Sequence, residues 1–171
     1  MNKLERNLID NLLESEVKLG YAGTPITFYY PESSLTGLLD CDADGLAAAI
    51  AGFQKKEQDR LGNIEIEELR HEKGRYAVMI PAGGVSWVHE NFEPSAFMKD
   101  FVSEIGKPGN TLEGILEVFY KYSREVDIKQ ESTGEWAVSF RDESIDPYIY
   151  HIEQNEFGLE YHRFTRDSYP F

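Results

Sequence analysis

The sequence predicts an α+β fold in which hairpins form an antiparallel sheet and helices pack on one face of it. Three observations favour this class. Apolar residues recur at helical spacing in some segments, they alternate at strand spacing in others, and glycine or proline marks most of the boundaries. The 171 residues are 41% hydrophobic and 28% charged, which suits a chain that buries its own core. We therefore expect a single globular domain, residues 1–171.

The first half of the chain is expected to form helices, a strand and a hairpin. A leucine stripe over 4–19 predicts a helix that stops at Gly20. Thr24–Tyr30 is rich in β-branched and aromatic residues and ends at Pro31, which is typical of a strand. A short helical turn capped by Ser33 or Ser34 should follow. Beyond it, a helix over 44–60 and a hairpin over 64–80 with its turn near Gly74 are predicted.

The second half is expected to repeat this order. It has a helix over 95–105, a second helix opened by Asn110, whose spacing to Glu113 resembles a capping box, and a hairpin over 126–140 that turns at Gly134. A last hairpin is predicted over 148–164.

Two segments of similar sequence suggest an internal duplication. GRYAVMI occupies 74–80 and GEWAVSF occupies 134–140, each beginning at the glycine of a hairpin turn. The repeat halves would be 1–81 and 95–141, with the hairpin 148–164 added. Shared periodicity of unrelated amphipathic segments explains the same likeness. The first half carries an extra segment, residues 20–40, that the second half lacks.

Part of this extra segment resembles a known family. The residues concerned are Lys18-Leu19-Gly20-Tyr21, Tyr29-Tyr30-Pro31 and Ser33-Ser34-Leu35. They resemble an uncharacterised bacterial family, the domain of unknown function 3877, whose members are similar in length. The resemblance implies no activity, no cofactor and no catalytic residue.

Composition argues against several classes of function. With 17 Lys and Arg against 31 Asp and Glu, the formal charge is −14, which repels nucleic acid in the absence of a segregated basic patch. The acidic charge suits a basic protein partner or simple solubility. The first twenty residues are charged throughout, so we expect neither a signal peptide nor a membrane span. The only cysteine, Cys41, fits a reducing compartment, and a cytoplasmic location is expected.

Metal-binding patterns are incomplete. DCDADG at 40–45 copies the first half of a calcium loop, but Ala51 stands where the closing glutamate belongs. A helix start with acidic residues near its positive end explains the same pattern. His151 and His162 lie on the two arms of the last hairpin, with Glu153 and Glu160 near them. The four residues could bind zinc, or they could simply occupy the solvent-exposed face of the hairpin. We expect no metal site, no cofactor and no metal requirement for stability.

The segment PAGGVSWVHENF, residues 81–92, is expected to be a loop that closes over the sheet edge. Gly83 and Gly84 would let the backbone approach a ligand or adopt positive φ. Ser86 and His89 are close in sequence, but the G-x-S-x-G motif of a nucleophile elbow is absent.

Two hypotheses of function remain. The first is a cytoplasmic, non-enzymatic module that binds a protein or a small ligand through six residues: Tyr29, Tyr30, Ser33, Ser34, Trp87 and His89. In an extended strand, the two tyrosines must point to opposite faces, so one should join the core. The second is a small-molecule enzyme that uses a pocket near Trp87, His89 and Glu90. A deep pocket with a buried His–carboxylate contact would favour the enzyme, and a flat aromatic patch would favour the interaction protein.

Overall fold

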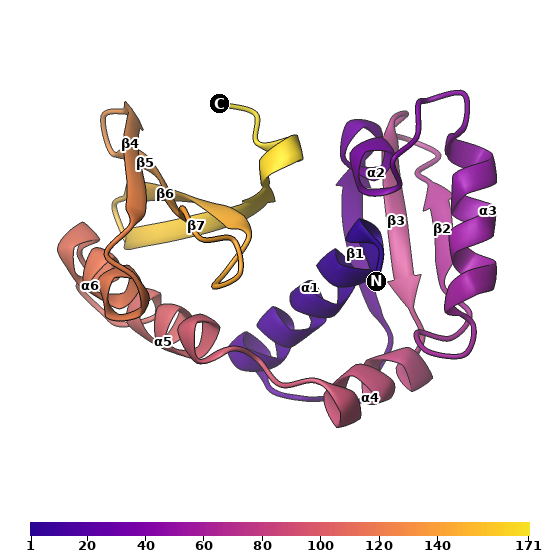
Figure 1. The fold of residues 1–171 in the computed structure, drawn as a ribbon, viewed down its shortest axis with the longest axis horizontal. Coiled ribbons are helices and arrows are strands. Elements are labelled where there is room, and N and C mark those ends of the chain that lie inside the picture. Colours follow the sequence, from indigo (N-terminus) through magenta and orange to yellow (C-terminus); the bar gives the residue numbers. More distant parts are fainter. The chain divides into compact units, whose positions relative to one another are not determined.

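The computed structural model describes residues 1–171, which form helices and two antiparallel sheets (Figure 1). The α+β class is therefore confirmed. The chain divides into two compact units, Met1–Pro94 and Ser95–Phe171, and each has its own sheet. The strands thus form two sheets instead of one: β1, β3 and β2 pair in the first unit, and β4 to β7 pair in the second. That the whole chain acts as one domain stays a prediction.

The first unit contains α1 (Lys3–Leu19), β1 (Ile26–Pro31), α2 (Glu32–Leu38), α3 (Leu46–Glu57), β2 (Glu65–Glu68), β3 (Arg75–Ile80) and α4 (Ala82–Asn91). Its strand order is β1-β3-β2, and both pairings are antiparallel. The predicted first helix is confirmed, with Asn2 accepting the Glu5 N–H at its start and Gly20 (φ 82°) donating its N–H to the Glu16 carbonyl at its end. Leucines at helical spacing along α1 are buried: Leu4, Leu8, Leu12 and Leu13.

Two local predictions in this unit are wrong. The segment 81–92 is not a loop, because Ala82–Asn91 forms the helix α4 after Pro81, which enters it with extended backbone. The turn after β1 is also a helix, α2, but neither serine caps it. Its N-cap is Pro31, without a side-chain bond, and Ser33 and Ser34 lie inside the first turn.

The second unit contains α5 (Ala96–Ile105), α6 (Leu112–Tyr122), β4 (Val126–Ser132), β5 (Glu135–Phe140), β6 (Tyr148–Asn155), β7 (Gly158–Thr165) and a 3-10 turn, Arg166–Ser168. Its strands follow sequence order in one sheet, and α5 and α6 cover one face of that sheet (Figure 1). Aromatic rings dominate the core between them: Phe97, Phe101, Phe119, Phe140, Tyr148 and Tyr150. The expected helix layer on one sheet face is present here.

Asn110 does not open α6 as expected. The cap is Thr111, whose hydroxyl accepts the Gly114 N–H at 3.1 Å. Asn110 instead donates to the Ile105 carbonyl at 2.6 Å and accepts the Leu159 N–H at 3.0 Å, so it ties the end of α5 to β7. The hydrogen bonds of Asn110 to Leu159 join residues that are far apart in the chain, so the spacing between Asn110 and Glu113 could not predict them.

The structure does not confirm the internal duplication. The two matching hairpins do share a turn geometry, since Gly74 and Gly134 have φ of 77° and 79°. Their helices differ, however, because α5 and α6 follow each other directly, whereas β1 and α2 separate α1 from α3. The hairpin likeness therefore follows from a shared turn requirement. No helix in either unit has the length and apolar character needed to cross a membrane.

Candidate functional site

A cavity of about 330 Å³ lies in the first unit, bounded by the C-terminal half of α1, the segment 20–26 and α4. Most of its wall is apolar or glycine, including Leu12, Leu19, Ala22, Ile26, Val85 and Val88. Glu16 is the only charged residue in the wall, and Ser15, Tyr21 and Thr24 supply hydroxyls. Cavities of this size and character hold small molecules in many proteins.

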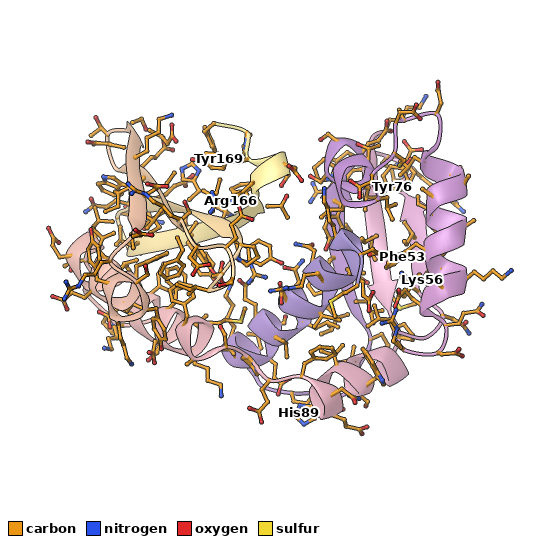
Figure 2. The ribbon with its side chains drawn as sticks, in the orientation of Figure 1. Phe53, Lys56, Tyr76, His89, Arg166 and Tyr169 are labelled. Carbon is orange, nitrogen blue, oxygen red and sulfur yellow. The ribbon has the colours of Figure 1, made fainter.

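A chain of side-chain contacts runs beside the cavity and joins its three walls. His89 Nδ1 lies 2.8 Å from Glu16 Oε1, which links α4 to α1. The Tyr21 ring stacks on the His89 ring, with 3.8 Å between centroids and 6° between planes. The Tyr21 hydroxyl lies 2.7 Å from Ser86 Oγ. Ser86 and His89 are one turn apart on α4 and therefore face the same way; Figure 2 labels His89 on this helix.

The segment after α1 owes its path to two glycines. Gly20 and Gly23 have φ of 82° and 65°, values that other residues rarely adopt. A Cβ on Gly23 would also lie 3.2 Å from the Tyr21 hydroxyl. This backbone brings Tyr21 back over α4, where it contacts both His89 and Ser86.

The His89–Glu16 contact is accessible to water. The side chain of His89 is 41% exposed and that of Glu16 is 25% exposed. Water screens such a pair, so its contribution to stability is small, about 0–1 kcal/mol. The contact positions the cavity wall, and it lacks the burial that our enzyme hypothesis requires.

The two tyrosines of β1 point to opposite faces, as expected. Tyr30 is 7% exposed, and its hydroxyl donates to Asn7 Oδ1 at 2.7 Å and accepts from Asn11 Nδ2 at 3.0 Å. Tyr29 is 54% exposed, with the Arg75 guanidinium 5.4 Å from its ring centroid. Tyr30 is thus a core residue that fastens β1 to α1, and only Tyr29 is available at the surface.

The structure does not gather all of the predicted binding residues. Ile26, which lines the cavity, pairs with Ile80, whereas Tyr29 pairs with Ala77 three residues further along the strand, on the order of 10 Å away. Ser33 is exposed, and its carbonyl accepts the Thr36 hydroxyl at 3.0 Å.

On α4 the predicted residues also separate. Trp87 packs edge-on against Phe92, with centroids 5.5 Å apart, and it does not line the cavity. Glu90 is exposed. Of the six predicted binding residues, His89 alone joins the contacts beside the cavity. Sequence reasoning missed Glu16 and Tyr21, although Tyr21 belongs to the Lys18–Tyr21 motif.

The residues considered as ligands in the first unit have local structural roles. Asp42 Oδ1 accepts the Gly45 N–H at 2.8 Å, and Asp40 pairs with Lys3 at 3.1 Å. The calcium-like run is therefore a turn before α3. Desolvation, followed by the charges of Asp42 and Asp40, raises the pKa of the Cys41 thiol, so little of it is the reactive thiolate at neutral pH.

Comparison with known proteins identifies one family. Residues 1–170 match the family described as a domain of unknown function with an E. rectale gene description, DUF3877. The match covers nearly the whole chain, well beyond the N-terminal motif that first suggested it. No curated protein and no solved structure matches the chain.

Proposed function

Because the chain belongs to the DUF3877 family, which has no assigned activity, we propose a function from the geometry: the first unit is a non-enzymatic module that binds a small, largely apolar amine. One observation carries this proposal. The cavity of about 330 Å³ has an apolar wall that contains a single charged side chain, Glu16. The apolar body of a ligand would displace water from the wall, and its ammonium group would meet the carboxylate.

Charge supports a cationic ligand over an anionic one. Placing a ligand carboxylate beside Glu16 would cost free energy, because two like charges would lie close together at a site that water only partly screens. The formal charge of −14 adds a long-range attraction for cations and a repulsion for anions. We therefore expect strong discrimination between an amine and an acid of equal size.

The contacts beside the cavity favour binding over catalysis. A serine nucleophile needs a base within hydrogen-bond reach. The partner of the Ser86 hydroxyl is Tyr21, and the partner of His89 Nδ1 is Glu16, so no serine–histidine hydrogen bond is formed. These residues hold the segment 20–26 against α4 and give the cavity its shape.

The first test compares two probes of similar size and opposite charge. Calorimetric titration of the full chain should detect 2-phenylethylamine, with 3-phenylpropanoate binding at least about tenfold more weakly. Equal affinity for both probes, or no binding of the amine at millimolar concentration, would contradict the proposal.

Two pairs of variants locate the binding. Ala22→Trp places a large side chain at the cavity wall and should abolish amine binding, whereas Ala47→Trp changes an exposed residue of α3 and should not. Glu16→Gln should weaken amine binding about tenfold, because a charge-assisted hydrogen bond contributes roughly 1.5–3 kcal/mol. Glu14→Gln removes a charge from the same helix, away from the cavity wall, and should change the affinity less than about twofold. If Ala22→Trp binds the amine with unaltered affinity, the amine does not bind in this cavity and the proposal is wrong.

A further inference from the structure

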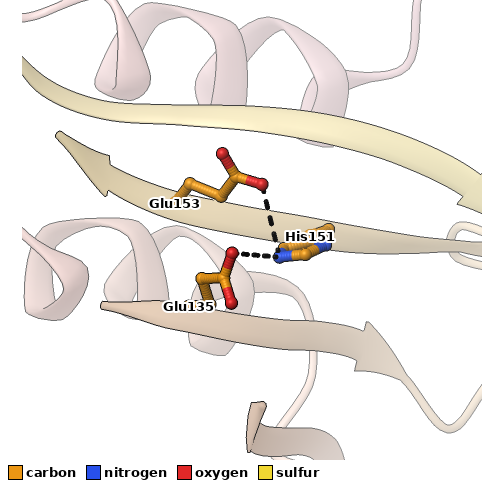
Figure 3. A group of neighbouring side chains, drawn as sticks. All are labelled: Glu135, His151 and Glu153. Atoms are coloured by element: carbon orange, nitrogen blue, oxygen red, sulfur yellow. Dashed lines mark ion pairs between the residues drawn. The ribbon is translucent and has the colours of Figure 1, made fainter. Parts of the chain in front are cut away.

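A histidine and two glutamates meet on the sheet of the second unit (Figure 3). Glu135 on β5 pairs directly with Glu153 on β6, and His151 lies two residues before Glu153 on the same side of the strand. His151 Nε2 is 3.7 Å from Glu153 Oε1 and 4.0 Å from Glu135 Oε1. One ligand atom from each of the three residues lies within 4.8 Å of the others. We propose that Glu135, His151 and Glu153 bind a divalent transition-metal ion of the zinc type.

His151 supplies the observation that goes beyond a cluster of acidic residues. Its side chain is 1% exposed, and its Nε2 atom is buried without a hydrogen-bond partner. A buried polar atom left unpaired costs about 1–3 kcal/mol, so most are paired. In Figure 3 this nitrogen points between the two carboxylates. A metal ion placed there would give the nitrogen and both glutamates a common partner.

No basic side chain neutralises the two carboxylates. No lysine or arginine forms an ion pair with Glu135 or Glu153, and the neighbouring Lys129 pairs with Glu131 at 3.4 Å. Two negative charges therefore face a single imidazole. A divalent ion compensates both charges at once, which explains why the arrangement is tolerable beside a buried side chain.

The donor set selects the class of metal. One imidazole nitrogen and two carboxylate oxygens form the kind of three-ligand site that holds Zn²⁺ and leaves a position open, whereas Mg²⁺ and Ca²⁺ prefer oxygen alone. Tetrahedral zinc with bonds of about 2.1 Å places its ligand atoms roughly 3.4 Å apart. The two His151 distances, 3.7 and 4.0 Å, must shorten by roughly 0.3 and 0.6 Å, and the two glutamate oxygens, which lie within 4.8 Å of each other, must also come closer. The glutamate side chains, 35% and 34% exposed, have the freedom to move that far.

The surroundings orient the ligands. The Phe171 ring packs edge-on against His151 with centroids 4.5 Å apart, and Phe164 and Tyr169 lie near the same ring. These rings fix the plane of the imidazole. The Ser132 hydroxyl donates to Glu135 Oε2, so it is the other oxygen, Oε1, that lies nearer His151. Hydrogen bonds of this kind position metal ligands in known sites.

The sequence predicted this group only in part. It placed His151 and His162 on the two arms of the last hairpin with Glu153 and Glu160 near them, did not include Glu135, and favoured no metal site. His162 does pair with His151 in register, and Glu160 with Glu153, but neither belongs to the cluster. Glu135 comes from the preceding hairpin, and only the pairing of β5 with β6 brings it close.

Calorimetric titration with Zn²⁺ tests the site, using full-length protein treated with EDTA and then dialysed. We expect binding of one ion per chain. Glu135→Gln and Glu153→Gln keep side-chain size and should each weaken Zn²⁺ binding at least about tenfold, a loss of about 1.4 kcal/mol or more. Glu160→Gln is the matched control: it removes one charge opposite Glu153 but no ligand, and should change the affinity less than about twofold. If all three variants weaken Zn²⁺ binding equally, the ion is attracted by the overall negative charge and not bound by these ligands, and the proposal is overturned.

A second measurement reads His151 without replacing it, since a buried side chain is difficult to change safely. Histidine ring signals in ¹H–¹⁵N NMR spectra should respond to one equivalent of Zn²⁺ at His151 alone, and EDTA should reverse the change. The other three of the four histidines, His71, His89 and His162, are internal controls. A response at any of these in place of His151, or no response at all, would refute the site.

Discussion

Two adjacent glycines in the first turn of α4 should respond oppositely to the same substitution. Gly84→Ala would place a Cβ 2.1 Å from the Leu61 carbonyl oxygen and 2.9 Å from Ile80 Cγ2. Gly83→Ala would place a Cβ in open space, with nothing within 4 Å. Both residues are helical and neither has positive φ. The contrast therefore isolates how closely α4 approaches the backbone before β2.

The two substitutions are expected to change the free energy of unfolding in opposite directions. An alanine at 84 requires the backbone of Leu61 or the start of α4 to move by about 1 Å, because ordinary contacts with Cβ begin near 3.4 Å. Overpacking of this kind costs about 1–3 kcal/mol or more, and we expect a loss of about 3 kcal/mol in the free energy of unfolding. An alanine at 83 should raise that free energy by about 0.5–1 kcal/mol, since alanine favours helix over glycine.

Urea unfolding followed by far-ultraviolet circular dichroism measures both variants. The two substitutions change the unfolded chain equally, so the difference between them reports the native state. We expect the midpoints to move in opposite directions with an unchanged slope. If Gly84→Ala is as stable as Gly83→Ala, then α4 does not approach the Leu61 backbone this closely. Val85 and Val88 on α4 would then not form the cavity wall described above.

Three further predictions address the core, the pH dependence and the domain organisation. Tyr30→Phe should lower the free energy of unfolding by about 1–3 kcal/mol, because the hydrogen bonds of the Tyr30 hydroxyl with Asn7 and Asn11 are lost and only the bond between the two asparagines remains, while Tyr29→Phe should stay within about 0.5 kcal/mol. The pKa of Glu57 is raised above its usual value by desolvation and by the charge of Glu5, although Arg60 opposes part of this rise. The folded state therefore binds a proton on the Glu57 carboxyl more tightly than the unfolded state does. The contribution of protonated Glu57 to the free energy of unfolding is complete below pH 4.5 and is lost as the pH rises through the raised pKa of the folded state. Glu57→Gln should accordingly increase stability at pH 7 by about 1 kcal/mol and leave it nearly unchanged at pH 4, in denaturant titrations; a loss of stability at pH 7 would contradict the sign. The predicted single domain requires one calorimetric transition whose van't Hoff and calorimetric enthalpies agree, and two resolved transitions would refute it.

Elements with strong local signals could be predicted from the sequence. The leucine stripe of α1 and its terminal Gly20 depend only on neighbours in the chain, and so do the hairpins that turn at Gly74 and Gly134. The helix α4 was mistaken for a loop because two glycines lower helix propensity. One of them, Gly84, is required by the backbone of Leu61 rather than by a ligand, and that contact exists only in the folded chain.

The candidate sites could be predicted only in part. His89 was identified as a candidate residue, but its partners Glu16 and Tyr21 come from a distant helix and loop. His151 was identified together with Glu153, but Glu135 was not, because strand pairing across the sheet, and not spacing along one hairpin, brings Glu135 to them.

The sequence by itself determined the α+β class, most helices and hairpins, the acidic character and the opposite orientation of Tyr29 and Tyr30, because periodicity and turn residues act over a few positions. Only the tertiary structure decided the division of the strands between two sheets, the cavity beside α1 and the group around His151. Each of these depends on segments that are far apart in the chain and are brought together when apolar surface is buried, and no local pattern encodes which segments will meet.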